Sequence, residues 1–377
     1  MNYFRDNINA ISGYVPGEQP PPEAKVIKLN TNENPYPPSP AALKVLQEME
    51  GELLRRYPDP MATAFRQSAS QVLGVPADWI LVGNGSDDLL TMIIRACAEP
   101  GRRVVYPMPT YVLYRTLTQI QGAEFVEVPY PEDYSLPIEQ LIEAQGAVTF
   151  VASPNSPSGT VASMERLDKL ASQLSGVLVV DEAYVDFAES DALELVKKYD
   201  NVIILRTLSK GYSLAGLRLG FGVANPALLE GLIKVKDSYN VDAIANAVGA
   251  AAIADQTHKN TNANKIKASR THMASALKQL GFQVWSSEAN FLLVSVSNTA
   301  SEELGELPPR EAPPLGNAES LYQTLKQRGI LVRYFNQPRL ADKLRITIGT
   351  PEQNETLIKN LDEVLNLSKQ SYLRPPS

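Results

Sequence analysis

Short apolar runs alternate with longer stretches of helical periodicity over the first part of the chain. The runs lie at residues 80–82, 103–106, 148–151, 177–180 and 202–205. Most are continuously apolar, which is typical of strands covered on both faces, and the helices between them would supply the crossovers of a parallel sheet. The pattern therefore predicts an α/β domain with helices packed around a mostly parallel sheet.

The two ends of the chain depart from this pattern. Residues 1–30 include the proline- and glycine-rich stretch GYVPGEQPPPEAK, which predicts an extended arm. A polar stretch at 256–268 leads into a second series of elements, with strands at 291–296 and 344–348 and an amphipathic helix near 351–368. This second series predicts a smaller α/β unit.

The length of the chain agrees with such a division. A chain of 377 residues exceeds the usual size of one hydrophobic core, so two domains are expected. We expect an N-terminal arm at 1–30, a large domain at 31–262 and a small C-terminal domain at 263–377 that packs with the arm. The prolines and acidic residues of 301–317 predict a surface loop.

Composition and charge argue against several kinds of partner. The 35 Lys and Arg residues face 42 Asp and Glu residues, a net charge of −7, and no basic block of the kind that binds nucleic acid stands out. The start of the chain has no secretory signal pattern, and no apolar run is long enough to span a bilayer. We expect a cytoplasmic protein that binds neither nucleic acid nor a membrane.

The single cysteine and the two histidines carry no predicted chemistry. Cys97 cannot form an internal disulfide, and it shares a helical apolar face with residues 89–94, so we expect it to pack in the core. His258 and His272 lie in polar helical sequence far from any glycine-rich loop, which argues against a histidine triad or a histidine metal site. No metal site is predicted.

Polar and aromatic residues follow the predicted strands, where ligands collect in an open parallel sheet. After the first run, GNGSDD at 83–88 opens a helix, and a glycine loop with the free N–H groups of a helix start can bind an anion. The residues past the later runs are Tyr111, Asn155, Asp181, Tyr184, Ser209 and Lys210. Taken singly, each has a structural explanation, such as an N-cap at Ser86 or a solvated lysine.

Taken together, these residues meet the needs of one cofactor. They supply an aromatic face, an amide, a carboxylate, a phenol, a lysine, and an anion site formed by the glycine loop and Arg218 of TLSKGYSLAGLRLG. Pyridoxal phosphate requires a lysine for its aldehyde, a carboxylate for its ring nitrogen and a cradle for its phosphate. The set therefore indicates a pyridoxal-phosphate-dependent enzyme.

Motifs over nearly the whole chain make this more specific. They are LNTNENPYPPSP (29–40), RYPDP (56–60), GNGSDD, PTYVLY, SPNSPSG, DEAYVDF, TLSKGYSLAGLRLG and LRITIGT (344–350). With them the chain resembles the fold-type I, class II pyridoxal-phosphate-dependent aminotransferases, and most closely the histidinol-phosphate aminotransferase family. That family commonly has Gly, Glu and Thr where this chain has Pro37, Asp88 and Ser158. The resemblance implies a mostly parallel seven-stranded sheet in the large domain and a homodimer.

The resemblance also implies roles for single residues at the cofactor. Lys210 would hold the cofactor aldehyde and later carry a proton as the catalytic lysine. Asp181 would keep the ring nitrogen protonated, Asn155 and Tyr184 would hydrogen-bond the ring hydroxyl, and Tyr111 would stack on the ring. The phosphate would be bound by Gly85, Ser86, Asp87, Ser209, Arg218 and, from the neighbouring subunit, Tyr57. We expect backbone N–H groups of 85–87 to make these contacts, because the Asp87 side chain would repel a dianion.

Substrate residues are implied in the same way. The reaction would transfer an amino group between L-histidinol phosphate and 2-oxoglutarate, giving imidazole acetol phosphate and glutamate, in histidine biosynthesis. Arg345 and Arg333 would bind the substrate phosphate or carboxylate, because an arginine can form paired hydrogen bonds with either. Tyr14 and Glu33 of the N-terminal region would line the same pocket, together with Asn155.

Other interpretations stay open on the sequence. An aromatic-amino-acid aminotransferase and a phosphothreonine-type decarboxylase share the cofactor residues, so only the substrate pocket separates them. A pyridoxal-phosphate-binding transcription regulator would need an added helix-turn-helix domain and a basic surface. A nicotinamide dehydrogenase would need a GxGxxG motif after a strand. A surface ion pair is the alternative role for Arg333.

Overall fold

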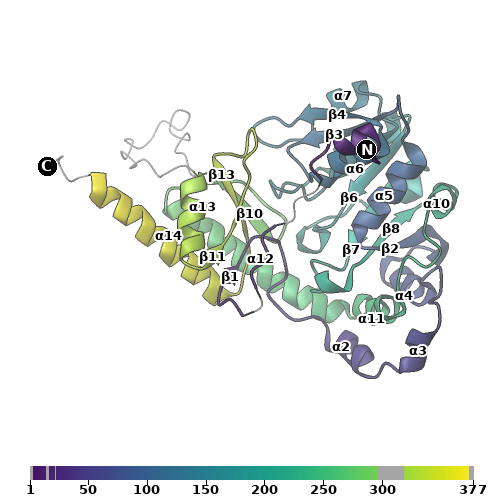
Figure 1. The fold of residues 1–377 in the computed structure, drawn as a ribbon, viewed down its shortest axis with the longest axis horizontal. Coiled ribbons are helices and arrows are strands. Elements are labelled where there is room, and N and C mark those ends of the chain that lie inside the picture. Colours follow the sequence, from purple (N-terminus) through teal and green to yellow (C-terminus); the bar gives the residue numbers. More distant parts are fainter. Residues whose placement is uncertain (1–2, 14–16, 22, 296–317, 373–377) are drawn as a thin grey trace.

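The computed structural model describes residues 3–13, 17–21, 23–295 and 318–372 (Figure 1). A seven-stranded sheet forms the centre of the larger part, in the order β2-β8-β7-β6-β5-β3-β4. Its strands are β2 Ile80–Asn84, β3 Arg103–Met108, β4 Glu124–Pro129, β5 Val148–Ala152, β6 Val177–Asp181, β7 Val202–Thr207 and β8 Leu219–Ala224. β8 is antiparallel to both neighbours and the other neighbouring pairs are parallel, which confirms the predicted mostly parallel sheet.

The apolar runs did not mark two of these strands, β4 and β8. β4 lies at an edge of the sheet, and its sequence EFVEVP contains glutamates. β8 is buried along its whole length, but glycines interrupt its apolar run. Gly220 is required there because a Cβ would lie 2.3 Å from the backbone nitrogen of Ser86, where α5 (Ser86–Cys97) begins.

Helices cover both faces of the sheet, because successive strand residues point to opposite faces. On one face, Val104 and Ile203 pack with α5, α6 (Leu113–Gln121) and α10 (Pro226–Ile233). On the other, Val105 and Ile204 share a core with α4 (Thr63–Leu73), α7 (Ile138–Glu143), α8 (Met164–Gln173) and α11 (Ala243–Ala254). Half-buried Cys97 packs against the first of these cores, as predicted.

The smaller part is built on an antiparallel sheet in the order β12-β13-β10-β9. Its strands are β9 Gln283–Val284, β10 Phe291–Ser295, β12 Arg333–Tyr334 and β13 Lys343–Thr347. Its core is shared with α12 (Gln256–Gln279), α13 (Ala318–Gln327) and α14 (Pro351–Tyr372). The two longer strands and the last helix lie where the sequence predicted them, and the predicted loop at 301–317 lies outside the described residues.

The N-terminal region contacts both parts of the molecule. It contains the short helix α1 (Asp6–Asn9), which lies against α6, and β1 (Ile27–Lys28), which pairs in parallel with β11 (Ile330–Leu331) of the smaller part. Next along the chain, α2 (Pro40–Gln47) and α3 (Gly51–Arg55) stand at the lower edge of the larger part in Figure 1. The predicted boundary at 262 falls inside the continuous helix α12, so the three-part division stays a prediction.

The remaining short helices connect these elements. They are α9 (Leu195–Lys198) and the single turns η1 (Ala77–Trp79), η2 (Val185–Phe187) and η3 (Ala215–Leu217). No helix in the described part of the chain is long and apolar enough to cross a membrane.

Candidate active site

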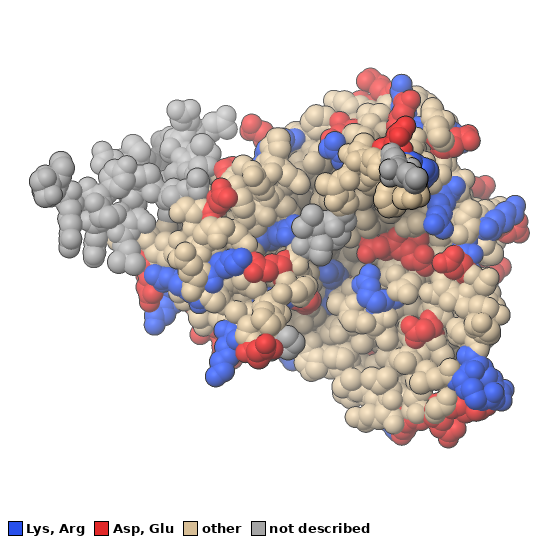
Figure 2. Space-filling view, in the orientation of Figure 1, with Lys and Arg blue, Asp and Glu red and all other residues tan. Residues whose placement is uncertain are grey.

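A cavity lies where the carboxyl ends of the large sheet face the smaller sheet. In Figure 2 the surface is hollowed between the two parts, with acidic and basic side chains along the hollow. Among the residues predicted for the site, the following line the cavity: Ser86, Asp87, Tyr111, Asp181, Tyr184, Ser209, Lys210, Arg218, Arg333 and Arg345. Strand ends that are far apart in the sequence converge here because parallel strands end at the same edge of their sheet.

Asp181 is the buried carboxylate of the cavity. It ends β6, and its Oδ2 accepts a hydrogen bond of 2.7 Å from the Tyr114 hydroxyl while its Oδ1 accepts one of 3.1 Å from the Ala183 N–H. Burial raises the pKa of Asp181 to about 6, although both hydrogen bonds oppose this shift, and the carboxylate of Asp87 raises it further. A cationic partner would therefore stabilise the ionised form of Asp181.

The next residue, Glu182, belongs to a different environment. Its carboxylate accepts hydrogen bonds from Arg206 Nε at 2.8 Å and from the Ala192 N–H at 2.5 Å, away from the cavity lining. Burial raises the pKa of Glu182 to about 7, and the nearby guanidinium opposes the shift. Of the two adjacent acids, only Asp181 is placed to meet a ligand in the cavity.

Lys210 follows β7 and projects into the cavity. Its Nζ donates to the Thr31 carbonyl at 3.3 Å and lies 5.8 Å from the centre of the Tyr184 ring. Asn34 Nδ2 donates to the Lys210 and Gly211 carbonyls at 3.1 and 3.2 Å, which holds the backbone of the lysine. Within the described residues, Lys210 forms no ion pair with a carboxylate, so its amine is available to a ligand.

The start of α5 forms a site for an anion. No side chain caps this helix, and Gly85 precedes it with φ of 79°. The positive φ favours glycine at this position, and a Cβ at Gly85 would lie 2.8 Å from Arg218 Nη2 and displace the guanidinium. Arg218 also pairs with Asp87 at 3.4 Å. Free N–H groups, the helix dipole and a guanidinium together favour a phosphate at this point.

Two arginines lie side by side on neighbouring strands of the smaller sheet. Arg333 on β12 is directly paired with Arg345 on β13, so both side chains lie on one face of the sheet. Their guanidinium carbons lie 5.2 and 5.5 Å from the ring centre of Phe335. Arg345 also donates to Ser156 Oγ at 3.0 Å and to the Asn30 carbonyl at 2.9 Å. Like charges in directly paired positions repel, and an anion bound between them would relieve that repulsion.

Four predicted residues are placed differently. Asn155 is buried, and its amide bonds to Thr110 at 2.7 Å, to Ser158 at 2.9 Å and to the Pro109 carbonyl at 3.2 Å, outside the cavity lining. Glu33 accepts from Lys28 Nζ and does not line the cavity either. The roles of these two residues stay predictions.

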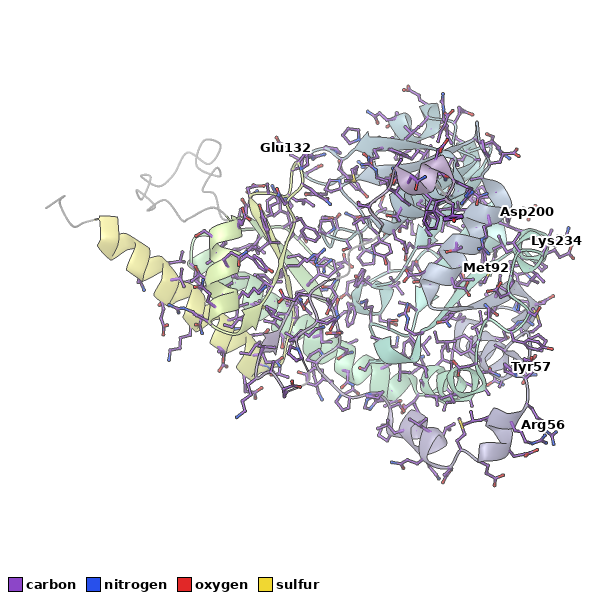
Figure 3. The ribbon with its side chains drawn as sticks, viewed as in Figure 1. Arg56, Tyr57, Met92, Glu132, Asp200 and Lys234 are labelled. Atoms are coloured by element: carbon purple, nitrogen blue, oxygen red, sulfur yellow. The ribbon has the colours of Figure 1, made fainter. Side chains whose placement is uncertain are left out.

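Tyr57 and Tyr14 are the other two of these residues. Tyr57 is 81% exposed, and its ring stacks on Tyr239 with the ring centres 4.6 Å apart. Figure 3 shows it at the outer edge of the larger part, on the side away from the smaller sheet. Tyr57 therefore does not reach the cavity of its own chain. Tyr14 lies outside the described residues.

Sequence reasoning assigned no role to several residues that the structure brings to the site. Tyr114 donates to Asp181, and its ring stacks on Phe150 with the centres 4.6 Å apart. Asn32 lines the cavity and donates to the Tyr184 hydroxyl at 2.9 Å. Both residues lie in quoted motifs, PTYVLY and LNTNENPYPPSP, but only their tertiary contacts indicate what they do.

The residues present fit pyridoxal phosphate, the cofactor that the resemblance implies. The cavity has the amine of Lys210, a buried carboxylate at Asp181 and an anion site at the start of α5. These are the three groups that the cofactor requires. Tyr111 adds an aromatic ring to the cavity wall.

The chain is similar to known proteins over nearly its whole length. Residues 24–361 match the family described as aminotransferase class I and II. Histidinol-phosphate aminotransferase 1 of Trichormus variabilis is 63% identical over 97% of this chain and 99% of that protein. Histidinol-phosphate aminotransferase of Citrifermentans bemidjiense is 44% identical over 97% of this chain and 99% of that protein.

A solved structure extends the comparison to the fold. Histidinol-phosphate aminotransferase from Sinorhizobium meliloti, in complex with pyridoxal-5'-phosphate, has a TM-score of 0.83 and 26% identity over 97% of this chain and 98% of that one. The family resemblance inferred from the motifs is confirmed. The chain therefore belongs to the aminotransferase class I and II family.

Proposed function

We propose that this aminotransferase moves an amino group between L-histidinol phosphate and 2-oxoglutarate, with pyridoxal phosphate as its cofactor. The products would be imidazole acetol phosphate and glutamate, and the reaction would serve histidine biosynthesis. The relatives at 63% and 44% identity, over nearly the whole chain, support this substrate. The observation that carries the proposal is that Lys210, Asp181 and the paired arginines line the same cavity.

The residues of the cavity would have different chemical roles. When bound, the cofactor supplies an electron sink for the pair of electrons released at the substrate carbon. Asp181, held by Tyr114 and the Ala183 N–H, would pair as a carboxylate with the protonated ring nitrogen. Lys210 would carry a proton to and from the substrate carbon, and its Nζ lies in the cavity, 5.8 Å from the centre of the Tyr184 ring.

The paired arginines explain how one pocket serves two substrates. Histidinol phosphate has no α-carboxylate, so its anionic group is the phosphate, whereas glutamate and 2-oxoglutarate bring carboxylates. Arg345 is held by hydrogen bonds to Ser156 and Asn30 and would bind the anion, and Arg333 would supply a second guanidinium from the neighbouring strand. Both phosphate and carboxylate accept paired hydrogen bonds from a guanidinium, so the same subsite accommodates either.

We also propose a homodimer with composite active sites. Tyr57 is exposed and stacked on Tyr239, and Leu53 and Leu54 are exposed beside it on α3. Such an apolar and aromatic surface suits burial against a second copy, and symmetric dimers are the commonest assembly. In the dimer Tyr57 would reach the cofactor phosphate of the partner. A cytoplasmic location is proposed as well, supported by the single cysteine.

The first experiment identifies the lysine and the substrate together. Protein loaded with pyridoxal phosphate is reduced with borohydride and digested, and the label should fall on the peptide that contains Lys210, with Lys210→Ala as the unlabelled control. Unreduced protein is then mixed with histidinol phosphate, phenylalanine or threonine phosphate, and conversion to the pyridoxamine form is followed by absorbance. Histidinol phosphate should convert the cofactor at the highest kcat/KM. Labelling of another lysine, or faster conversion by phenylalanine, would contradict the proposal.

The second experiment tests the dimer. Tyr57→Phe and Lys210→Ala chains should each be of low activity, and mixing them should restore part of the activity because one hybrid site in the mixed dimer has both groups intact. Sedimentation at working concentration gives the mass independently. A monomer, or a mixture no more active than its components, would show that Tyr57 does not complete a partner's site.

A further inference from the structure

Hydrogen bonds to the smaller sheet hold Asn32 beside the cavity. Its N–H donates to Thr347 Oγ1 at 3.0 Å, and the Thr347 hydroxyl donates to Asn32 Oδ1 at 2.9 Å. Asn290 Nδ2 donates to the Asn32 carbonyl at 2.9 Å. Asn32 is 1% exposed and has φ of 58°, a left-handed conformation that asparagine adopts more readily than most residues. Contacts from β13 and the start of β10 thus hold this residue in one orientation.

The remaining hydrogen-bonding group of Asn32 faces the cavity. Its Nδ2 donates to the Tyr184 hydroxyl oxygen at 2.9 Å. A phenol has one proton to donate, so a Tyr184 oxygen that accepts from Asn32 leaves its own proton free to point at a ligand. The Thr347 hydroxyl sets this direction, because its proton occupies Oδ1 and turns the amide nitrogen toward Tyr184.

We propose that Asn32 is a positioning residue that makes Tyr184 a hydrogen-bond donor to the ring hydroxyl oxygen of the cofactor. The inference rests on the proposed function, since it concerns the ligand of the same cavity. Of the two residues predicted to bond this oxygen, Tyr184 lines the cavity and the Asn155 amide is bonded to Thr110, Ser158 and Pro109. The direction of the Tyr184 proton therefore decides whether the ring oxygen receives a hydrogen bond.

The surroundings of Tyr184 keep its ring in place. The ring packs edge-on against Phe291 with the centres 5.0 Å apart, and Lys210 Nζ lies 5.8 Å from its centre. The charged groups that share this cavity are Lys210 after β7, Asp181 at the end of β6, Arg345 and Arg333 on the smaller sheet, and Asp87 and Arg218 at the start of α5. None of them donates to the Tyr184 hydroxyl within the described residues, so Asn32 is the residue that orients it.

The test is the pH at which the visible spectrum of bound pyridoxal phosphate changes. A hydrogen bond donated to an oxyanion stabilises the ionised form, so Tyr184 lowers the pKa of the proton that the ring oxygen shares with the lysine-linked nitrogen. In Asn32→Asp the new side chain accepts and cannot donate, and it draws the Tyr184 proton away from the cofactor. The midpoint should rise by about half to one pH unit, as it should in Tyr184→Phe.

A double variant separates this route from the added charge. A direct effect of the new carboxylate would persist in the Tyr184→Phe background, whereas an effect through the hydroxyl should disappear, so Asn32→Asp/Tyr184→Phe should match Tyr184→Phe. The matched control is Asn262→Asp, a buried asparagine that donates to the Pro37 carbonyl, and its midpoint should equal that of the wild type. Thr347→Val keeps the shape of the side chain, frees the Asn32 amide and should shift the midpoint in the same direction, which keeps the test available if Asn32→Asp does not fold.

The outcomes distinguish a failure of the positioning role of Asn32 from a failure of the proposed function. An unchanged midpoint in Asn32→Asp and Thr347→Val overturns the positioning role, as does an equal shift in Asn262→Asp or additive shifts in the double variant. Wild-type protein that binds no pyridoxal phosphate and carries no borohydride label on Lys210 overturns the proposed function, and the inference about Asn32 with it. A labelled wild type with an unshifted variant overturns the inference alone.

Discussion

Replacement of Asp181 by asparagine should stabilise the cofactor-free protein at neutral pH, although it removes a residue of the candidate site. Asp181 is 5% exposed, and burial raises its pKa from 3.8 to about 6. A carboxyl group whose pKa is raised by folding contributes stability below its unfolded pKa, and that contribution is lost as the pH rises through the folded value. The ionised carboxylate therefore destabilises the fold above about pH 6, and asparagine carries no such charge.

The size of the effect follows from the shift. About two pKa units correspond to about 3 kcal/mol of unfolding free energy. Asparagine keeps an acceptor for the Tyr114 hydroxyl, but its amide group cannot accept from the Ala183 N–H as well, a loss of about 1 kcal/mol. That loss does not depend on pH. The difference in unfolding free energy between variant and wild type should rise by about 2.5 kcal/mol from pH 4 to pH 8, with its midpoint near pH 5, between the unfolded and folded pKa values.

Urea unfolding of the cofactor-free proteins at several pH values measures this difference. Asp168→Asn is the control, because Asp168 is only partly buried and a hydrogen bond from Lys198 lowers its pKa, so it should produce no such rise. Loading with pyridoxal phosphate should remove most of the difference, because the protonated ring nitrogen then neutralises Asp181. If this difference in unfolding free energy does not change between pH 4 and pH 8, the ionised carboxylate of Asp181 does not destabilise the cofactor-free fold, and the reasoning is refuted.

Two further predictions concern the anion sites. Gly85→Ala should weaken binding of pyridoxal phosphate by tenfold or more, because a Cβ there meets the guanidinium of Arg218 and a φ of 79° is strained for alanine. Fluorescence titration measures this, and unaltered affinity would contradict the assigned cradle. Arg345→Ala should lower kcat/KM by on the order of a hundredfold in both half-reactions, whereas Arg333→Ala should impair histidinol phosphate more than glutamate. These effects are measured in the two half-reactions separately. Equal, slight losses in Arg333→Ala would indicate that Arg333 has only a surface role. An unimpaired phosphate half-reaction in Arg345→Ala would contradict the proposal of a shared subsite.

Local sequence was sufficient to predict the buried parallel strands and some of the residues of the site. Continuous apolar runs marked the buried parallel strands, because a strand covered on both faces has no polar side to show. Asp181 and Lys210 were predictable as neighbours, since both follow such runs and parallel strands end at one edge of the sheet. The anion site at the start of α5 was readable from its glycines, because few other residues permit that backbone conformation.

Tertiary structure decided what depends on pairing between distant segments. The register of β12 and β13 placed Arg333 opposite Arg345, and the packing of β6 turned Asp181 to the cavity and Glu182 to Arg206. Asn32 reached Tyr184 across 152 residues of sequence. No periodicity within a single segment encodes such contacts, because they depend on which elements meet and in which register. The sequence by itself therefore determined the buried strands with continuous apolar runs and the chemical groups at their ends, and only the folded chain decided which of those groups face one another.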